Sequence, residues 1–254
     1  MRNNILSAFK HCGEVVRENL MDVDMDLGKT VGMGADGTPI KALDQMAEES
    51  AVEVIKERIG CSILSEEAGF IEGDSPGVVI LDPIDGTGNA LLGIPFYSIS
   101  MAYTTSDLAC VEVGYVMNLS SGKEYYAVKG HGYTEKKPFD REKMTFSVYL
   151  GKEAHPDNFK VARIPRRTRS LGSAALEMSM VADGIFDVYF MKTLDTHRSL
   201  RITDIAASTL ILREAGGQVY GDDFQPLNMP LDPKLRRDII AVRDPDLLEV
   251  LSWA

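Results

Sequence analysis

The stretch Leu81-Asp82-Pro83-Ile84-Asp85-Gly86-Thr87-Gly88-Asn89 ends an apolar run that starts at Val78. Such a run predicts a short buried strand, so both aspartates follow the end of that strand. The proline fixes φ and turns the chain, which aims the two carboxylates at one spot. Gly86 and Gly88 bring backbone N–H groups forward, as in a phosphate cradle. Taken alone, the same residues also suit a turn with two solvated aspartates.

Two further acidic points carry the same chemistry. Glu66 and Glu67 follow a predicted strand at residues 61–64, and Asp204 opens a predicted helix over residues 204–215. Carboxyl ends of strands meet at one edge of an open sheet, where ligands bind. Carboxylates that lie close together repel one another, and a fold tolerates such a cluster when hard cations bind it. Oxygen ligands of this kind suit Mg²⁺ or Mn²⁺. Taken singly, adjacent glutamates are common on surfaces, and an aspartate at a helix start favours the helix dipole.

The composition is that of an ordinary globular protein. The chain has 254 residues, of which 44% are hydrophobic and 26% charged, which excludes collagen-like, disordered and coiled-coil classes. Its formal charge of −11 disfavours nucleic acid as a partner. Three widely spaced cysteines give no support to a disulfide scaffold or a thiolate zinc site. We expect a soluble, cytoplasmic protein, because no signal peptide is evident and the apolar runs are too short for a membrane span.

Hydrophobic periodicity predicts alternating helices and strands along the chain. The predicted helices span residues 4–20, 43–59, 173–182, 204–215 and 245–251, and the predicted strands residues 61–64, 77–81, 97–104, 111–117, 124–128, 186–191 and 239–242. Residues 130–170 are predicted to be irregular, and the glycine-rich residues 28–39 to form a lid over a site. We expect one unit over residues 1–254, with the metal site and lid in residues 1–130 and the substrate contacts and Asp204 in residues 131–254.

Three motifs together resemble the signatures of a known family. Ser65-Glu66-Glu67, residues 82–87 and Thr203-Asp204-Ile205-Ala206-Ala207 resemble, in order and spacing, the inositol monophosphatase family of Mg²⁺-dependent, lithium-sensitive sugar phosphatases. Residues 34–39 and the following Asp44 are similar to the archaeal branch, which often hydrolyses both fructose 1,6-bisphosphate and inositol 1-phosphate. The sequence departs from the family pattern at Ser65, where glycine is usual, and at Thr203, where tryptophan is usual.

The resemblance implies a fold and a set of site residues. The implied fold is α+β, a layered α-β-α-β-α sandwich of the sugar-phosphatase superfamily, with two or three Mg²⁺ ions per site and Mn²⁺ as an alternative. The implied metal ligands are Glu66, Asp82, the carbonyl of Ile84, Asp85 and Asp204. The implied catalytic residues are Thr87, paired with Asp44, and Glu66, which together orient the attacking water.

Substrate contacts are expected at a second group of residues. Residues 171–175, Leu-Gly-Ser-Ala-Ala, match the family's substrate-contacting turn at a helix start. The glutamate that grips inositol in animal members has no clear counterpart, and residues 191–201 carry basic side chains there, which favours a second phosphate. Arg201, in that segment, also suits a structural role at the helix start. The expected contacts are Asp85, Gly86, Thr87, Arg169, Gly172, Ser173, Ala174, Lys192 and Arg198.

The leading hypothesis is Mg²⁺-dependent hydrolysis of a sugar or polyol phosphate monoester, with fructose 1,6-bisphosphate ahead of inositol 1-phosphate. We expect a homodimer or homotetramer that binds neither nucleic acid nor membrane. An alternative in the same superfamily is a 3′-phosphoadenosine phosphate or NADP phosphatase, which needs an adenine slot that the sequence does not identify. An alternative of another class is a catalytically silent metal-binding scaffold, but all four ligand carboxylates are present here.

Overall fold

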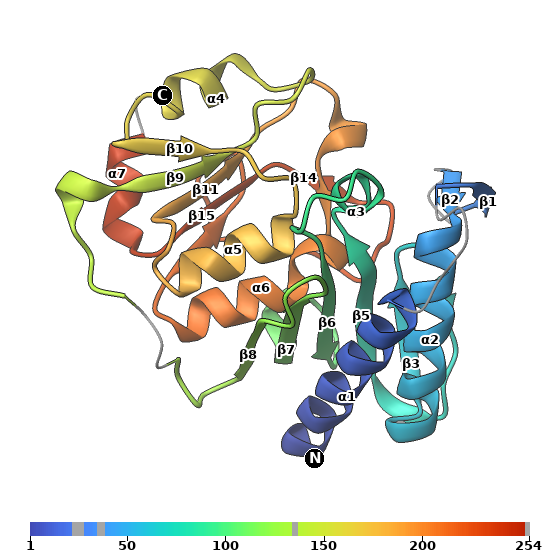
Figure 1. Cartoon of the computed structure of the whole chain (residues 1–254). Helices are drawn as coiled ribbons and strands as arrows, with labels where there is room; N and C mark the ends of the chain where they lie inside the picture. Colours follow the sequence, from blue (N-terminus) through green and yellow to red (C-terminus); the bar gives the residue numbers. More distant parts are fainter. Residues whose placement is uncertain (22–27, 35–38, 134–136, 252–254) are drawn as a thin grey trace.

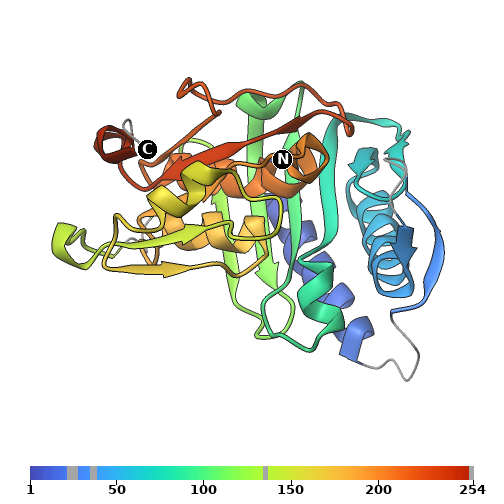
Figure 2. The same cartoon turned by 90° about the horizontal axis from the view of Figure 1, so that it is seen from above.

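Helices and sheets alternate in five layers in the computed structural model, which describes residues 1–21, 28–34, 39–133 and 137–251 (Figure 1, Figure 2). The layers are, in order, α1 (Arg2–Met21) with α2 (Ala42–Arg58), a six-stranded sheet, α5 (Ala174–Ala182) with α6 (Ile202–Glu214), a five-stranded sheet, and α4 (Pro156–Val161) with α7 (Leu248–Leu251). This confirms the layered α-β-α-β-α sandwich that the resemblance implied.

The six-stranded sheet positions the first two acidic motifs. Its strands, in spatial order, are β4 (Gly69–Ile71), β3 (Cys61–Ser65), β5 (Ser75–Asp85), β6 (Ser98–Thr104), β7 (Val111–Asn118) and β8 (Glu124–Val128). β3 and β5 run parallel, and Ser65, the last residue of β3, pairs with Leu81 of β5. The residues that follow, Glu66 and Asp82, therefore lie at the same edge of the sheet, as the sequence predicted.

The five-stranded sheet forms the second half of the sandwich. Its strands, in spatial order, are β10 (Arg167–Arg169), β9 (Thr145–Val148), β11 (Val188–Met191), β15 (Ile239–Val242) and β13 (Gln218–Tyr220). Smaller elements are the pairs β1 (Thr30–Met33) with β2 (Pro39–Lys41) and β12 (Leu200–Arg201) with β14 (Arg236–Arg237), the helix α3 (Thr87–Leu91), and 3₁₀ turns at Leu108–Cys110, Arg141–Lys143, Thr196–Arg198 and Pro245–Leu247.

The helix α6 lies at the centre of the core, between the two sheets (Figure 1). Residues 202–212 of this helix are all buried, and apolar side chains occur on every side of it without a separate polar face. A Cβ on Gly114 of β7 would lie 2.6 Å from the carbonyl oxygen of Ala207. Glycine at this position therefore allows α6 to approach the sheet closely, and that approach sets the position of the helix start with Asp204.

Two expectations about the middle of the chain need correction. Residues 130–170 are not irregular throughout, because they contain β9, α4 and β10. These elements are only three to six residues long, too short for periodicity to identify them. The strand that was predicted to end at Leu81 continues as β5 to Asp85, with a bulge between Asp82 and Asp85 in its pairing with β6.

The glycine-rich segment at residues 28–39 is in part regular. β1 and β2 pair there in antiparallel fashion, immediately before α2. Residues 35–38, which belong to the motif shared with the archaeal branch, lie outside the described residues. The expected closure of this segment over a site therefore stays a prediction.

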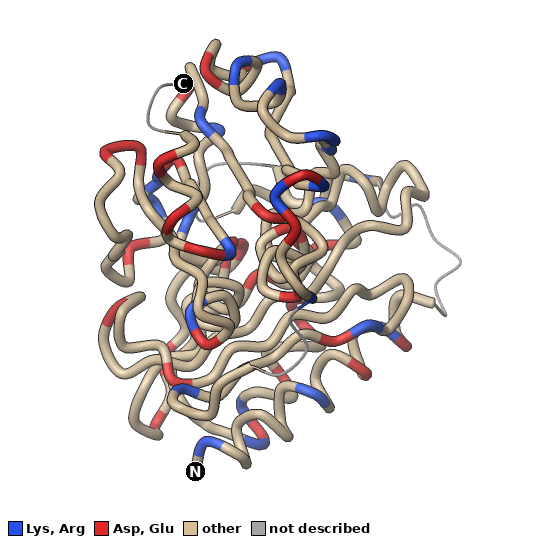
Figure 3. The backbone as a smooth tube through the Cα atoms, turned by 90° about the vertical axis from the view of Figure 1, so that its left-hand side faces the viewer, with Lys and Arg blue, Asp and Glu red and all other residues tan. Residues whose placement is uncertain are grey.

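Positions of Lys or Arg and positions of Asp or Glu are both spread over the described part of the backbone, with no separation of the two signs into halves of the fold (Figure 3). Among the residues that the structure describes, no helix combines the length and the apolar character needed to cross a membrane.

Candidate active site

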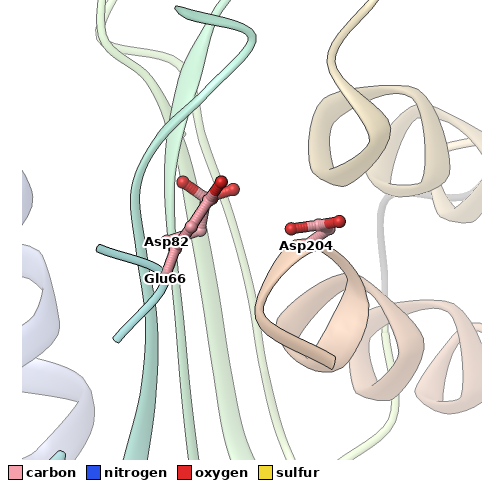
Figure 4. Close-up of side chains that lie close together, drawn as sticks. All are labelled: Glu66, Asp82 and Asp204. Atoms are coloured by element: carbon pink, nitrogen blue, oxygen red, sulfur yellow. The ribbon is translucent and has the colours of Figure 1, made fainter. Parts of the chain in front are cut away.

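Three carboxylates from separate elements converge at the edge of the six-stranded sheet. Glu66 follows β3, Asp82 lies in β5, and Asp204 lies in the first turn of α6, and one oxygen of each lies within 4.8 Å of the others. In Figure 4, Glu66 and Asp82 project side by side from the sheet, and Asp204 faces them from the helix start. Residues 138 positions apart along the chain therefore meet at one point, as the three motifs predicted.

Local hydrogen bonds hold these carboxylates in place. Asp82 accepts a hydrogen bond of 3.0 Å at Oδ1 from the backbone N–H of Ile84, so the turn at the proline fixes its side chain. Asp204 accepts one of 2.8 Å at Oδ2 from the N–H of Arg201, the residue at the N-cap of α6. Because an aspartate at the third helical position bonds back to the N-cap, its carboxylate stays at the helix N-terminus.

The Arg201 side chain contacts two of the three carboxylates. Its Nη2 donates to Oε1 of Glu66, and its Nε lies 3.4 Å from Oδ1 of Asp204. The side chain is only 11% exposed. From the sequence we expected this arginine to have a structural role, but the structure places its charge among the expected metal ligands. Because Arg201 precedes Asp204 by three residues at the start of a helix, the sequence spacing could have indicated this contact.

The Asp44–Thr87 pair lies beside this cluster. The Thr87 hydroxyl lies 2.9 Å from Oδ1 of Asp44 and 3.0 Å from the carbonyl oxygen of Ile84, and it has one proton to donate. Asp44 is buried in the first turn of α2, where its Oδ2 accepts a hydrogen bond from the N–H of Lys41. The structure therefore brings together the two residues that the resemblance paired, and Ile84 with them.

Asp85 faces the start of α5. Its oxygens accept hydrogen bonds from the Ser173 hydroxyl at 2.5 Å, the Ala174 N–H at 3.2 Å and the Ala175 N–H at 2.8 Å. Asp85 thus joins the turn at residues 171–175 to the acidic motif, and the contact of these residues with a substrate stays a prediction. It is not a member of the 4.8 Å group, and its role as a metal ligand stays a prediction.

A buried glutamate that the sequence analysis missed shapes the same turn. Glu177 is 3% exposed and accepts hydrogen bonds of 3.1–3.2 Å from the N–H groups of Leu171, Gly172 and Ser173. It also accepts one from the Ser147 hydroxyl. The sequence could have indicated this role, because Glu177 is the one charged residue in the otherwise uncharged helix of residues 174–182.

A cavity of about 340 Å³ opens beside Asp85. Its walls are formed by Asp85, Tyr149, Gly151, Ser170, Leu171, Gly172, Ser173, Ala174, Glu177, Tyr189, Met191 and Leu200. Gly86, expected among the substrate contacts, lies against this turn, since a Cβ on it would be 3.1 Å from the carbonyl oxygen of Gly172. The cavity wall is therefore built from the predicted turn together with an apolar and aromatic side.

The three expected basic contacts lie elsewhere. Lys192 forms an ion pair of 2.9 Å with Asp157 and lines a different cavity. Arg169 is exposed on β10, where its Nη1 donates to the Thr168 carbonyl at 2.8 Å, and Arg198 is exposed in a 3₁₀ turn. The structure does not bring these side chains to the cavity beside Asp85, so their contact with a second phosphate stays a prediction.

Burial changes the protonation of the acidic cluster. It raises the pKa of Glu66 to about 7, although the charge of Arg201 opposes this shift, and it raises the pKa of Asp85 to about 7. Burial and then the neighbouring carboxylate of Glu66 raise the pKa of Glu67 to about 8. The pKa of Asp82 also lies well above its ordinary value because of burial. Near neutral pH the metal-free cluster therefore retains protons that ordinary carboxyl groups would lose, and bound cations would favour the ionised form.

The donors at this site fit a hard divalent cation. They are carboxylate oxygens together with the backbone carbonyl of Ile84, which is the ligand chemistry that Mg²⁺ and Mn²⁺ prefer. The Oε2 atom of Glu67 is buried without a hydrogen-bond partner among the described residues. A cation bound by Glu66, Asp82 and Asp204 would relieve the mutual repulsion of these carboxylates.

Comparisons with known proteins agree with this geometry. The profile of the inositol monophosphatase family matches residues 2–250. A fructose-1,6-bisphosphatase/inositol-1-monophosphatase of Methanothermobacter thermautotrophicus is 38% identical, covering 88% of this chain and 86% of that protein. A bifunctional NADP phosphatase/NAD kinase of Methanococcus maripaludis is 35% identical, covering 84% of this chain and 42% of that protein. A Pyrococcus horikoshii structure with similarities to inositol-1 monophosphatase matches with a TM-score of 0.85 at 26% identity, over 99% of this chain and 98% of that one.

Proposed function

The chain belongs to the inositol monophosphatase family of phosphomonoesterases, and from this premise we propose that it hydrolyses fructose 1,6-bisphosphate and inositol 1-phosphate with Mg²⁺. The observation that carries the proposal is the convergence of Glu66, Asp82 and Asp204 within 4.8 Å. A catalytically silent scaffold would have no need of the Asp44–Thr87 pair beside that cluster. The cytoplasmic location and the homodimer or homotetramer expected from the sequence stay predictions.

The acidic cluster would hold the metal ions through which a phosphate binds. Glu66, Asp82 and Asp204 would hold two or three Mg²⁺ ions, with the Ile84 carbonyl and Asp85 as further ligands. When bound, such ions neutralise phosphate charge, lower the pKa of a bound water and stabilise the leaving oxygen. The carboxylates themselves would repel a phosphate, so we expect substrate binding to need the ions.

The Asp44–Thr87 pair orients the attacking water. Because the Thr87 hydroxyl donates its proton to Asp44, the lone pairs of its oxygen are available to accept a hydrogen bond from water. This contact would aim a water lone pair away from Thr87, and the water proton could pass to the Thr87 oxygen as the Thr87 proton passes to Asp44. Glu66, a member of the cluster, would hold the second hydrogen of that water.

The turn at residues 171–175 would hold the substrate body next to the reacting phosphate. Glu177 fixes the backbone of this turn, and Asp85 fixes the first turn of α5. A sugar or polyol in the adjoining cavity would therefore meet a rigid wall on the side of α5. Support for fructose 1,6-bisphosphate and inositol 1-phosphate comes from the archaeal relative with both activities in its name.

A specific observation favours NADP as a second candidate substrate. The cavity beside Asp85 has Tyr149, Tyr189, Met191 and Leu200 in its wall and neither Lys nor Arg. Such a wall suits an uncharged ring better than a second phosphate, because aromatic and apolar side chains bind the faces of planar rings. A relative that is 35% identical carries NADP phosphatase in its name.

A substrate panel tests the proposal. Phosphate release is measured with saturating Mg²⁺ for fructose 1,6-bisphosphate, inositol 1-phosphate, NADP and 3′-phosphoadenosine phosphate, and kcat/KM is compared. We expect the first two to exceed the nucleotides. A preference for NADP that Tyr189→Leu abolishes would favour the second candidate, and hydrolysis of none of the four would contradict the proposal.

The arginines expected at a second phosphate are tested with the same assay. If they hold it, Arg169→Ala and Arg198→Ala raise KM for fructose 1,6-bisphosphate roughly ten- to a hundredfold, in line with loss of one charge-assisted contact. KM for inositol 1-phosphate then changes much less, since that substrate has one phosphate. Equal changes for both substrates would remove the basis for a bisphosphate preference at these residues.

A further inference from the structure

We propose that Arg201 is an internal cation of the acidic cluster, which partly neutralises Glu66 and Asp204 in the metal-free protein and competes with divalent ions for them. The inference rests on the proposed function, because it concerns the same carboxylates. It goes beyond that function by assigning Arg201 an effect on metal affinity that opposes binding. The carboxylates are ligands, whereas Arg201 is a residue that sets how tightly those ligands take up an ion.

The contacts of Arg201 join two layers of the fold. Glu66 belongs to the edge of the six-stranded sheet and Asp204 to α6, and the guanidinium contacts both. The planar guanidinium has N–H donors on three nitrogens, so it can bridge two carboxylates in this way. A lysine ammonium has its donors on one nitrogen atom. The bridge thus keeps the two halves of the ligand set together when no ion does so.

The position of Arg201 in the chain fixes the bridge. Arg201 is in β12, which pairs with β14, and Arg201 lies opposite Arg236 in that pair. Its N–H bonds to Oδ2 of Asp204, and its side chain turns back to Oδ1 of the same residue. Since one residue holds Asp204 through its backbone and neutralises it through its side chain, the carboxylate cannot turn away from the cluster without breaking both contacts.

Competition with metal ions follows from these contacts. The Oε1 atom of Glu66 and the Oδ1 atom of Asp204 already face a positive charge. A divalent ion that enters must either share these oxygens with the guanidinium or displace it, and both cost binding free energy through repulsion of like charges. Removal of the arginine charge should therefore strengthen metal binding and weaken the metal-free fold.

The test compares Arg201→Gln with a matched control. Arg237→Gln removes the same charge from the neighbouring strand β14, where Arg237 is exposed and its Nη1 donates to the carbonyl of Arg236. Calorimetric titration with Mn²⁺ gives Kd, and thermal unfolding in EDTA gives the stability of the metal-free protein. These two readouts need no substrate and no turnover.

We expect Arg201→Gln to lower Kd for Mn²⁺ at least about tenfold, since a unit charge at ion-pair distance is worth more than that factor in a partly buried site. The same variant should unfold several degrees below the wild type in EDTA and gain more from added Mn²⁺. Arg237→Gln should leave Kd within about twofold of the wild type. Arg201→Lys keeps the positive charge but loses the planar guanidinium. This variant should give a Kd for Mn²⁺ closer to that of the wild type than Arg201→Gln does.

Two results would overturn the inference while leaving the proposed function in place. One is weaker Mn²⁺ binding by Arg201→Gln, which would mean that the arginine helps to build the site. The other is an unchanged Kd. The proposed function itself fails if the wild type shows no saturable Mn²⁺ binding, or if Asp82→Asn binds Mn²⁺ as tightly as the wild type.

Discussion

At the residue scale, the site is a set of carboxylates whose burial would be unfavourable without partners. Asp82 is 2% exposed and Asp204 is 6% exposed, and both face Glu66. Backbone N–H groups satisfy part of their hydrogen bonding, and Arg201 supplies positive charge. What remains is a surplus of negative charge at one point, which makes the site responsive both to protons and to divalent cations.

The Thr87 hydroxyl should matter for turnover and not for metal binding. Thr87→Val keeps the shape of the side chain but removes the group that bonds to Asp44. We expect kcat to fall roughly a hundredfold or more, as for loss of a group that positions and deprotonates water, with Kd for Mn²⁺ unchanged. Thr87→Ser, which keeps the hydroxyl, is the control. Wild-type kcat in Thr87→Val would exclude this residue from the reaction.

The raised pKa values predict how the stability of the metal-free protein depends on pH. Glu66 and Glu67 ionise near pKa 4.5 in the unfolded chain, but at about 7 and about 8 in the fold. Between these values the folded state binds more protons, so its free energy of unfolding falls as pH rises. The contribution is complete below pH 4.5 and is lost as pH passes through the folded values.

Thermal unfolding of the metal-free protein at a series of pH values measures this effect. We expect Tm to decrease from about pH 5 to about pH 8, and saturating Mg²⁺ to reduce or reverse the trend, because metal ions bind the ionised carboxylates. Glu67→Gln should make the slope in the metal-free protein shallower. A Tm that rises with pH in the absence of metal would contradict the burial of these groups.

At the element scale, the parallel pairing of β3 and β5 brings Glu66 and Asp82 to the same edge of the six-stranded sheet. This arrangement could be predicted from the sequence because both strands are apolar runs that lead into acidic residues. It did not predict that β5 continues through a bulge to Asp85, since a proline usually argues against a strand. It also missed β9, α4 and β10, because elements this short have no measurable period and depend on contacts with distant strands.

The turn before α5 should be sensitive to backbone strain. Gly172 has a φ of +86°, in the left-handed region that disfavours side chains, and the carboxylate of Glu177 holds its N–H. Gly172→Ala should cost about 1–2 kcal/mol of stability and displace the turn, and we expect kcat/KM to fall at least about tenfold, as for a misplaced substrate contact.

A matched control separates strain from function. Gly130 has a φ of +83° and open space where a Cβ would lie, and it is in an exposed turn after β8. Gly130→Ala should lose a similar free energy of unfolding, as measured by chemical denaturation, and keep its kcat/KM. Equal losses of kcat/KM in the two glycine variants would show that the effect is global and that the turn has no special role.

At the scale of the whole molecule, the site exists only when both sheets and the helices between them are assembled. The motifs predicted the carboxylate cluster and the Asp44–Thr87 pair, because the family resemblance transfers the residues that are expected to act directly on metal and water. They did not reveal the bridge made by Arg201, the carboxylate of Glu177 or the aromatic wall of the cavity. These depend on which side chains distant segments bring together, and no single stretch of sequence encodes that.

Metal binding should therefore stabilise the whole fold. Ions that bind the native state and not the unfolded chain add about 2.7 kcal/mol at a concentration a hundredfold above Kd. For a chain of this size that corresponds to a rise in Tm of roughly 5–10 °C. Thermal unfolding with EDTA and with Mg²⁺ measures the difference, and Asp82→Asn should show a smaller one. The same rise in Asp82→Asn would place the stabilising ion elsewhere.

The most direct test of the account is the Mg²⁺ dependence of phosphate release from fructose 1,6-bisphosphate and inositol 1-phosphate. The protein is dialysed against EDTA, and kcat is then measured as Mg²⁺ is added back to the wild type and to Asp82→Asn. We predict no turnover without metal, full recovery in the wild type, and at least about a hundredfold lower kcat in the variant, in line with loss of a positioned electrostatic group. Full turnover in excess EDTA, or wild-type kcat in Asp82→Asn, would contradict a metal-dependent phosphatase site at these carboxylates.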